Sequence, residues 1–154
     1  MAKILIHPFA SKLQSGKMNA KSFPYWRELK VLLHQQGHTL TQIGTDQEED
    51  LDMDEFKKNL PMDEVRKEIN NHDFFIACDS FIPHMGATEG VSGIVIFSKS
   101  DPKIFGYEFN DNLVKPEHLR SSQHAVWSEV PWVKEAFVKP EEIAVVVEKW
   151  AKGE

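Results

Sequence analysis

The sequence predicts one α/β domain with a Rossmann-like, three-layer arrangement, in which a mainly parallel sheet lies between two layers of helices. Two observations predict this fold. Short apolar runs, typical of strands buried on both faces, alternate with segments whose apolar residues recur at helical spacing. The helical segments are roughly 10–15 residues long, as in βαβ units. Because 154 residues suit a single core, we expect one domain over residues 1–154.

Composition excludes several classes of protein. Hydrophobic residues make up 41% and charged residues 27% of the chain, which is ordinary for a soluble globular protein. A net charge of −6 disfavours nonspecific contact with nucleic acid. We see neither a transmembrane segment nor a signal peptide. A single cysteine, Cys78, allows no intrachain disulfide, so we expect a cytoplasmic protein in which Cys78 is a core residue rather than a nucleophile.

The first part of the chain predicts a strand, a loop and a helix. Residues 3–7 predict a short buried strand with an apolar centre, which ends before Pro8 because proline cannot donate to a sheet. Residues 11–20 are polar and aperiodic, as in a loop. Ser22 offers an N-cap and Pro24 suits a first helical turn. The apolar face of this helix consists of Tyr25, Trp26, Leu29, Leu32 and Leu33, and Gly37 is expected to end it.

The middle of the chain predicts three further strands. Residues 39–43 form a strand that ends at Gly44, and an acidic segment follows, which we expect to be a loop with a short helix near Phe56. The remaining expectations are a helix over 62–71, a strand over 74–78, a helix over 80–88 started by Asp79 or Ser80, and a strand over 93–97.

The last third of the chain gives a weaker signal until its end. Residues 101–138 contain Pro102, Gly106, Pro116 and Pro131, with strand-like pieces around residues 104–109. A terminal helix begins at Pro140, a residue that suits a first turn. Its apolar stripe consists of Ile143, Val146, Val147 and Trp150.

Polar loops follow three of the predicted strands, at the sheet edge where α/β proteins bind ligands. The loop after residue 7 carries Ser11, Lys12, Lys17 and Lys21. Hydroxyls, backbone amides and ammonium groups on one loop suit a phosphate or pyrophosphate. The alternative is an ordinary solvated loop, which is the commoner fate of lysines.

The other two loops carry acidic residues and a histidine. Glu48 follows the strand ending at Gly44 and could bind a ribose diol, although a glutamate in an acidic run is often simply solvated. Asp79 and Ser80 open a predicted helix, whose N-terminal amides suit a phosphate. His84 lies one turn further and could donate to a ligand oxygen. The alternative is a capped helix with a half-buried histidine.

Several well-defined sites are excluded by their missing motifs. The seven histidines and one cysteine show no paired spacing of metal ligands, so we expect no metal site. Neither G-x-G-x-x-G nor G-x₄-G-K-[ST] is present, which argues against a dinucleotide fingerprint and a P-loop. A serine hydrolase is not supported, because no G-x-S-x-G is found.

Together the loops resemble the C-terminal, donor-binding half of glycosyltransferase family 9, the heptosyltransferase-like enzymes of GT-B fold. The matching motifs, in chain order, are a His-Pro-Gly-Ala-Ser-like turn, Lys-x-Trp-Pro, a strand-end Gly with a Glu four residues on, Asp-Ser-Gly-x-x-His, and a Phe-Gly-x-Thr-x-Pro-like turn. They correspond here to His7–Ser11, Lys21–Pro24, Gly44 with Glu48, Asp79–His84 and Phe97–Pro102. The resemblance covers roughly residues 3–105 and the terminal helix.

The resemblance implies roles for these residues. Ser11 and Lys21 would lie near a diphosphate and Glu48 near a ribose. The residues around the diphosphate and donor sugar would be Asp79, Ser80 and His84. Three glycines of the family pattern are replaced, by Phe9, Phe81 and Ser98.

Our leading hypothesis is a glycosyltransferase-like domain that binds a nucleotide-diphosphate sugar. The N-terminal, acceptor-binding half of the family is absent from this sequence, so a partner chain or a homo-oligomer would have to complete the cleft and supply the base. Lys21 and His84 are then the catalytic candidates, acting on the departing diphosphate. No cofactor is expected, because the nucleotide sugar is a substrate.

Two alternatives remain at this stage. One is a non-catalytic module that keeps the fold and binds a nucleotide or serves assembly through Trp127 and Trp132, although these tryptophans are more simply explained by packing. The other is a small nucleotide- or nucleoside-processing enzyme on the same sheet, for which the sequence offers no convincing partner for His84 or Asp79.

Overall fold

A computed structural model describes the whole chain except residues 12, 14, 121, 124–129 and 154. The strands are β1 (Lys3–His7), β2 (Thr39–Gly44), β3 (Glu55–Lys58), β4 (Phe74–Cys78), β5 (Gly93–Ile96) and β6 (Asp111–Leu113). Within the described residues, they form one parallel six-stranded sheet in the order β3-β2-β1-β4-β5-β6.

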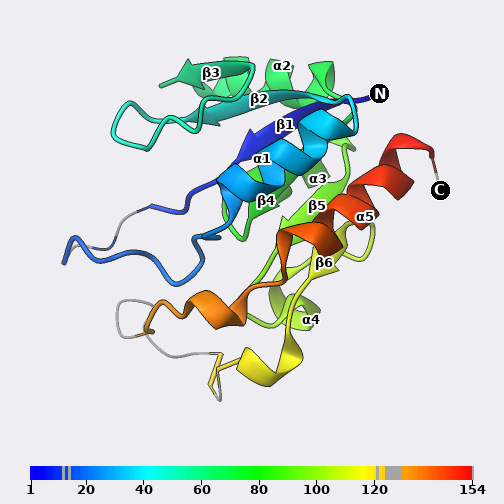
Figure 1. Cartoon of the computed structure of the whole chain (residues 1–154). Coiled ribbons are helices and arrows are strands. Elements are labelled where there is room, and N and C mark those ends of the chain that lie inside the picture. Colours follow the sequence, from blue (N-terminus) through cyan, green and yellow to red (C-terminus); the bar gives the residue numbers. More distant parts are fainter. Residues whose placement is uncertain (12, 14, 121, 124–129, 154) are drawn as a thin grey trace.

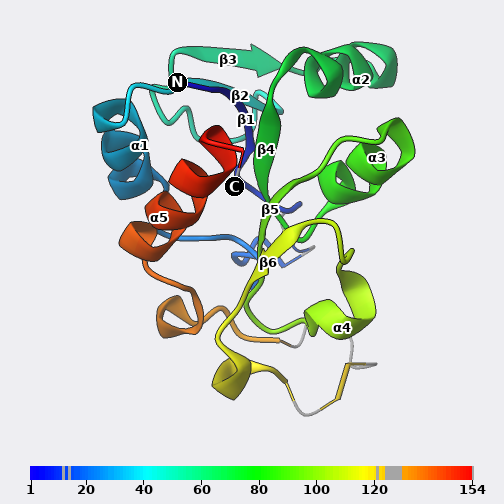
Figure 2. The same cartoon turned by 90° about the vertical axis from the view of Figure 1, so that its right-hand side faces the viewer.

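Helices cover both faces of the sheet. Helices α1 (Trp26–Gln35) and α5 (Pro140–Ala151) lie on one side, and α2 (Met62–Asn71) and α3 (Phe81–Glu89) lie on the other (Figures 1 and 2). The predicted Rossmann-like α/β fold is confirmed.

The principal helices match the predicted segments closely. They are α1 (Trp26–Gln35), α2 (Met62–Asn71), α3 (Phe81–Glu89) and α5 (Pro140–Ala151), with a short α4 (Pro102–Phe105) and 3₁₀ turns at Pro116–His118 and Lys134–Ala136. The helix α1 ends as predicted: Gly37, just past it, has a φ of 89°, which a residue without a Cβ adopts without strain. Helix α5 begins at Pro140, as predicted.

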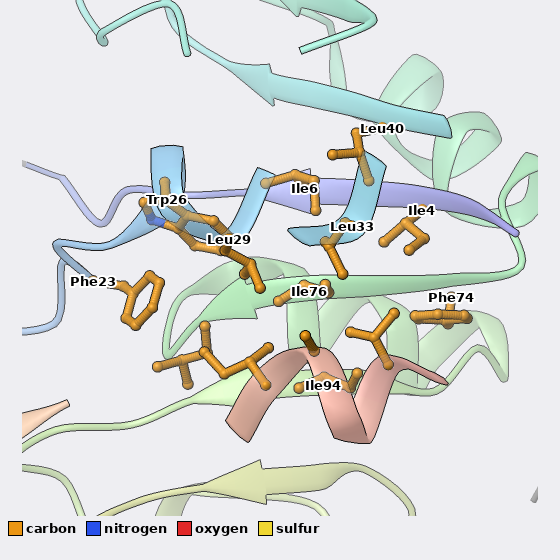
Figure 3. Close-up of a cluster of buried hydrophobic side chains, with 14 of the residues drawn as sticks. Ile4, Ile6, Phe23, Trp26, Leu29, Leu33, Leu40, Phe74, Ile76 and Ile94 are labelled. Atoms are coloured by element: carbon orange, nitrogen blue, oxygen red, sulfur yellow. The ribbon is translucent and has the colours of Figure 1, made fainter. Parts of the chain in front are cut away.

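Most of the core lies between the sheet and helices α1 and α5. Alternate residues of each strand face this side, and Figure 3 shows Ile4, Ile6 and Ile76 meeting the side chains of α1 and α5. The intervening residues, among them Leu5 and Phe75, face α2 and α3 and form a smaller cluster. This division explains why β4 is buried at every position.

Helix α3 approaches the sheet closely because two glycines receive the ring of Phe75. A Cβ at Gly86 or at Gly93 would come within 2.7 Å of that ring. The close packing sets the position of the loop between β4 and α3, which carries residues of the candidate site.

One predicted helix start and two predicted elements are wrong. Helix α1 starts at Trp26, with Tyr25 as its N-cap residue, and not at Ser22. Ser22 is buried in the preceding loop, where Phe23 packs edge-on against Trp26 at 5.1 Å and the Trp26 indole donates to Pro8 O at 3.0 Å. These contacts hold the segment in a non-helical path, so tertiary packing overrides the local capping signal.

The segment near Phe56 is strand β3 and not a short helix. It pairs with β2 between two residues in left-handed conformations, Asp52 and Asn59, with φ of 55° and 53°. The strand-like pieces at 104–109 are also replaced: α4 begins at Pro102, where the Asp101 side chain accepts from Lys103 N at 2.9 Å, and the strand comes later, as β6. The Asp-Pro pair is a helix-start signal that the prediction did not use.

The tryptophans proposed for assembly have different outcomes. Trp132 is half-buried, packs against the main core and donates from its indole to Ser22 O at 2.8 Å. Trp127 falls outside the described residues. Cys78 is fully buried, and burial raises the pKa of its thiol to about 12, which agrees with a core residue.

Candidate functional site

A cavity of about 430 Å³ opens at the carboxyl ends of β1, β2, β3 and β4. We call it the strand-end cavity. It lies where the strand order reverses, with β2 on one side of β1 and β4 on the other, which is the usual ligand position in open α/β sheets. Its lining residues are His7, Phe9, Ala10, Ser11, Asn19, Lys21, Ile43, Gly44, Thr45, Glu48, Lys57, Asn59, Leu60, Val65, Asp79, Ser80 and Phe81.

The cavity therefore gathers five of the six predicted site residues from loops that are far apart in the sequence. Ser11 and Lys21 come from the loop after β1, Glu48 from the loop after β2, and Asp79 and Ser80 from the end of β4. Parallel strands place these loops at one edge of the sheet.

Lys21 and Asp79 form an ion pair within the cavity. Their Nζ and Oδ2 atoms lie 3.2 Å apart, and the Asp79 side chain is only 9% exposed. The backbone of Lys21 is fixed as well, because its amide donates to Asn19 Oδ1 at 3.0 Å. Asp79 thus orients the Lys21 ammonium group, and the two predicted residues contact each other directly.

Ser80 lies at the N-cap position of α3 without capping it through its side chain. Its hydroxyl oxygen is 3.3 Å from Cys78 O, to which it donates, and 3.0 Å from His7 Nδ1. Because the Ser80 hydroxyl hydrogen points to Cys78 O, Ser80 Oγ can only accept from the imidazole, and His7 Nδ1 carries the hydrogen that it donates to Ser80 Oγ. Burial lowers the pKa of His7 to about 4, so His7 is neutral at neutral pH and has an unprotonated Nε2.

The first turn of α3 also faces the cavity through Ser80 and Phe81. The backbone amides of a first helical turn lack partners within the helix, and here the Ser80 side chain does not satisfy them. Pro83 carries no amide hydrogen. The amides of Phe81 and Ile82 are therefore the donors that this helix end offers to an anion.

Glu48 presents a carboxylate whose side chain lies directly over Gly44. A Cβ at position 44 would collide with Glu48 Oε2, so the absence of a side chain at Gly44 makes room for this carboxylate. Glu48 Oε2 is buried and has no hydrogen-bond partner among the described residues. Burial raises the pKa of the Glu48 carboxyl, and such an acceptor suits a hydroxyl donor from a ligand.

The loop that carries Glu48 is held by contacts that the sequence did not reveal. Gln42 in β2 is fully buried, donates to Glu49 O at 2.9 Å and accepts from Leu51 N at 3.1 Å. Arg27 of α1 pairs with Glu49 at 2.8 Å. The acidic segment is thus anchored to β2 and α1 at these points, while the side chains of Glu49 and Asp52 remain 58% and 75% exposed.

Two polar lining residues, Lys57 and Asn59, were missed because one lies in β3 and the other directly after it, and this strand was not predicted. Lys57 pairs with Glu68 at 2.5 Å, and the hydrogen bond that its ammonium group donates to that carboxylate raises the pKa of Lys57. Asn59 has the left-handed conformation noted above and accepts from Asp46 N at 3.2 Å through its side chain. The sequence signal that could have indicated them is Lys57-Lys58-Asn59, in which an asparagine, a residue that tolerates the left-handed conformation, follows two lysines.

The other predicted lysines of the first loop have different outcomes. Lys17 is exposed and is not a lining residue. Lys12 falls outside the described residues. Ser11 does line the cavity, and its carbonyl accepts from Asn19 Nδ2 at 3.0 Å, which ties the two sides of the loop together.

His84 is the predicted site residue that lies outside the cavity lining. It is exposed on α3, and its Nδ1 is 2.7 Å from the hydroxyl of Tyr107. Phe81, one turn earlier, lines the cavity instead: its ring is 42% exposed and lies edge-on to the His7 imidazole, with centroids 4.9 Å apart.

The described part of the chain contains neither a metal-type cluster of side chains nor a helix of membrane-spanning character. Within it, no three histidine, cysteine, aspartate or glutamate residues cluster in a way that could hold a metal ion. None of its helices is both long and apolar enough to cross a membrane.

Comparison with known proteins identifies the fold. No protein-family model matches the chain, and no curated protein matches its sequence. Among solved structures, 99% of the chain aligns with 46% of the dodecameric iron-containing heptosyltransferase TibC in complex with ADP-D-beta-D-heptose, with a TM-score of 0.71 and 15% identity. The E. coli ADP-heptose LPS heptosyltransferase II gives a TM-score of 0.68 at 14% identity, over 96% of this chain and 46% of that one.

A third structure, E. coli heptosyltransferase WaaC with ADP, aligns over 96% of this chain and 44% of its own, with a TM-score of 0.66 and 16% identity. The predicted resemblance to heptosyltransferases is therefore confirmed at the level of the fold. The chain spans less than half the length of these enzymes.

Proposed function

We propose that this chain binds a nucleotide-diphosphate sugar in the strand-end cavity and acts as the donor-binding part of a glycosyltransferase. The observation that carries the proposal is the meeting of Ser11, Lys21, Glu48, Asp79 and Ser80 around one cavity at the switch point of the sheet. Two of the structural neighbours described above contain ADP or an ADP-heptose, which supports a ligand of this class.

Each group has a chemical role in such a complex. The diphosphate would lie against the Lys21 ammonium, the Ser11 hydroxyl and the first-turn amides of α3, because charge-assisted hydrogen bonds favour phosphate oxygens. Glu48 Oε2 would accept from a ribose hydroxyl. Asp79 would keep the Lys21 ammonium directed into the cavity.

Transfer would also draw on the cation at Lys21. As the bond between the sugar and the diphosphate breaks, negative charge grows on the leaving diphosphate, and a fixed ammonium with a helix N-terminus stabilises it. His84 lies outside the cavity lining, so it would assist the departure of the diphosphate only after its hydrogen bond with the Tyr107 hydroxyl is replaced by one to the ligand. The acceptor site and the base would come from a partner chain or a second copy.

A second candidate function is a nucleotide-binding module without transfer activity. The observation in its favour is Phe81, whose ring lies in the cavity at the start of α3, where phosphate oxygens would approach the amides. In this case the chain would bind a nucleotide, but a sugar diphosphate would not reach a reactive position.

The proposal is tested by calorimetric titration of the full chain with ADP-, GDP- and UDP-sugars. We expect saturable binding of at least one donor and a loss of affinity of about 100-fold in Lys21→Ala, because a charged contact is removed and Asp79 is left buried without its cation. Lys67→Ala is the matched control, since Lys67 is an exposed lysine of α2 that pairs with Glu64 away from the cavity.

Absence of binding to all three donors would contradict the proposal, as would equal affinities of the Lys21→Ala and Lys67→Ala variants. Binding of the free nucleoside diphosphate and its sugar derivative with the same affinity would favour the second candidate function. A stronger affinity for the sugar derivative would favour the first.

A further inference from the structure

A further cavity, of about 380 Å³, lies on the α1 side of the loop that follows β1. We call it the aromatic cavity. It is bounded by the segment that leads into α1, by the acidic loop that docks on α1, and by the segment around Trp132. Phe9 lines both this cavity and the strand-end cavity, so the two are neighbours on either side of one side chain.

Among the described residues, four aromatic side chains line the aromatic cavity, and the two indole N–H groups among them already donate hydrogen bonds within the protein. The four side chains are Phe9, Phe23, Trp26 and Trp132. The Trp26 indole donates to Pro8 O at 3.0 Å and the Trp132 indole donates to Ser22 O at 2.8 Å. These bonds fix both indoles. Phe23 and Trp26 are each only 2% exposed and form the back of the wall, so a ligand would chiefly meet the carbon surfaces of the half-buried Phe9 and Trp132.

One hydroxyl in this wall is left without a partner. Ser22 is 2% exposed, and its Oγ has no hydrogen-bond partner among the described residues. Burial of an unsatisfied hydroxyl costs stability, so such a group usually bonds to an ordered water or to another partner outside the chain. Because Ser22 lines the aromatic cavity, a ligand in that cavity is in position to supply the partner.

The charged residues at the rim of the aromatic cavity balance one another. Arg27 and Lys134 are cationic, and Glu28 and Glu49 are anionic. Arg27 and Glu49 pair at 2.8 Å, and Lys134 lies over the Tyr25 ring at 5.2 Å from its centroid. The rim therefore offers hydrogen-bond donors and acceptors without an excess of positive charge, which disfavours a phosphate as the ligand.

We infer that the aromatic cavity binds a neutral carbohydrate. A pyranose ring has an apolar face of C–H groups that packs on aromatic carbon surfaces and a margin of hydroxyls that both donate and accept. The walls match that face, and the charged rim with Ser22 Oγ matches the hydroxyls. A purely apolar ligand would leave Ser22 Oγ unsatisfied and would desolvate the rim.

This inference stands apart from the proposed function, because none of its residues except Phe9 lines the strand-end cavity. If both sites are occupied, a sugar and a nucleotide sugar lie next to each other on one chain, separated by the Phe9 ring. Sugar binding without nucleotide binding, or the reverse, would show which of the two proposals fails.

The test is nuclear magnetic resonance of the ¹⁵N-labelled full chain, followed at the indole N–H signals of Trp26 and Trp132. The probes are methyl β-D-glucopyranoside, methyl α-D-mannopyranoside and maltose, with cyclohexanol and inorganic phosphate as comparison ligands. We expect saturable shifts with at least one sugar, at a dissociation constant on the order of millimolar, and weaker effects with both comparison ligands.

Two variants locate the site. Met18 is 53% exposed at this cavity, and Met18→Glu is expected to weaken sugar binding about tenfold by placing a charge against the apolar face of the sugar. Met62→Glu is the matched control, because Met62 is 57% exposed on α2 and lines neither cavity. Ser22→Ala removes the unpartnered hydroxyl and is expected to weaken binding several-fold, on the order of one hydrogen bond, while the fold persists.

Three outcomes would overturn the inference: no saturable shift with any sugar, shifts with cyclohexanol or phosphate that equal those with sugars, or equal sugar affinities of Met18→Glu and Met62→Glu. If Ser22→Ala does not fold, the two methionine variants decide the question by themselves.

Discussion

The two cavities on either side of Phe9 are built in different ways. The strand-end cavity collects polar side chains from the ends of four parallel strands, and two of its groups, His7 and Glu48, have pKa values displaced by burial. The aromatic cavity is built from one helix and its neighbouring loops, and its walls are rings already fixed by hydrogen bonds such as that from Trp26 to Pro8 O.

This difference teaches what each cavity depends on. The strand-end cavity depends on the order of the strands in the sheet and on the protonation of its side chains, so substitutions and pH should change it strongly. The aromatic cavity depends on ring packing, so it should respond little to pH. The following predictions use that contrast, and each can be measured beside the sugar response of the aromatic cavity.

The largest expected effect concerns His7. Its pKa is lowered to about 4 by burial, whereas the unfolded side chain titrates near 6.5, so the unfolded state takes up a proton first as the pH falls. The stability that neutral His7 contributes is present above pH 6.5 and is lost as the pH falls toward 4, by about 3 kcal/mol. In His7→Gln, the loss of unfolding free energy between pH 7 and pH 4 should be smaller by this amount.

Urea denaturation at the two pH values measures the difference, and His118→Gln is the control because His118 does not line the cavity. An unchanged pH dependence in His7→Gln would contradict the prediction. The sugar response of the aromatic cavity should be the same in both variants at pH 7.

Glu48→Gln should change affinity and stability in opposite directions. The raised pKa of the folded carboxyl means that ionisation costs stability as the pH rises through it, so the neutral amide should make the protein more stable at pH 7 and confer no gain well below pH 4.5. Loss of a charged acceptor for the ribose should weaken nucleotide-sugar binding by about 10- to 100-fold. Thermal unfolding and calorimetry measure the two effects, and a variant that loses stability together with affinity would count against this reading of Glu48.

Phe81→Gly should open the strand-end cavity. With the ring removed, the first-turn amides of α3 become more accessible, and we expect the affinity for a nucleotide-diphosphate sugar to rise about tenfold. Phe109→Gly is the matched control, because Phe109 is 50% exposed and lines neither cavity. Calorimetric titration of both variants measures the change. A weaker affinity in Phe81→Gly would mean that the ring contacts the ligand and does not obstruct it.

The smallest expected effect is that of Gly44→Ala. The new Cβ would displace the end of the Glu48 side chain, which is flexible, so the cost in stability should be below about 1 kcal/mol. Nucleotide-sugar affinity should still fall about threefold to tenfold, because the carboxylate leaves its position at the cavity. If affinity is unchanged while Glu48→Gln has its expected effect, Glu48 reaches the ligand from more than one conformation.

Sequence patterns predicted those parts of the fold in which local periodicity and burial agree. Strand β4 is apolar at all five positions because both faces of the sheet are covered, and α2 has the bounds expected from its helical spacing. Strand β3 (Glu55–Lys58) was missed because three of its four residues are charged and none is buried. At this edge of the sheet only pairing with β2 defines a strand.

For the candidate site, the sequence indicated the loops and the types of side chain that they carry. Because parallel strands end at one edge, the sequence predicts that five residues lie near one another: Ser11, Lys21, Glu48, Asp79 and Ser80. The sequence does not predict that His84 points toward Tyr107. A side chain one turn after Phe81 can lie toward the cavity or away from it, and the packing of α3 against the segment around Tyr107 decides which.

The sequence by itself thus determined the α/β class, the order of most elements and the edge of the sheet at which polar loops gather, because these follow from periodicity and chain direction. Tertiary structure alone decided that Lys21 pairs with Asp79, that Gly44 makes room for Glu48, and that Phe9 separates two cavities. Such contacts join residues distant in the chain, and their geometry depends on how close-packed elements meet.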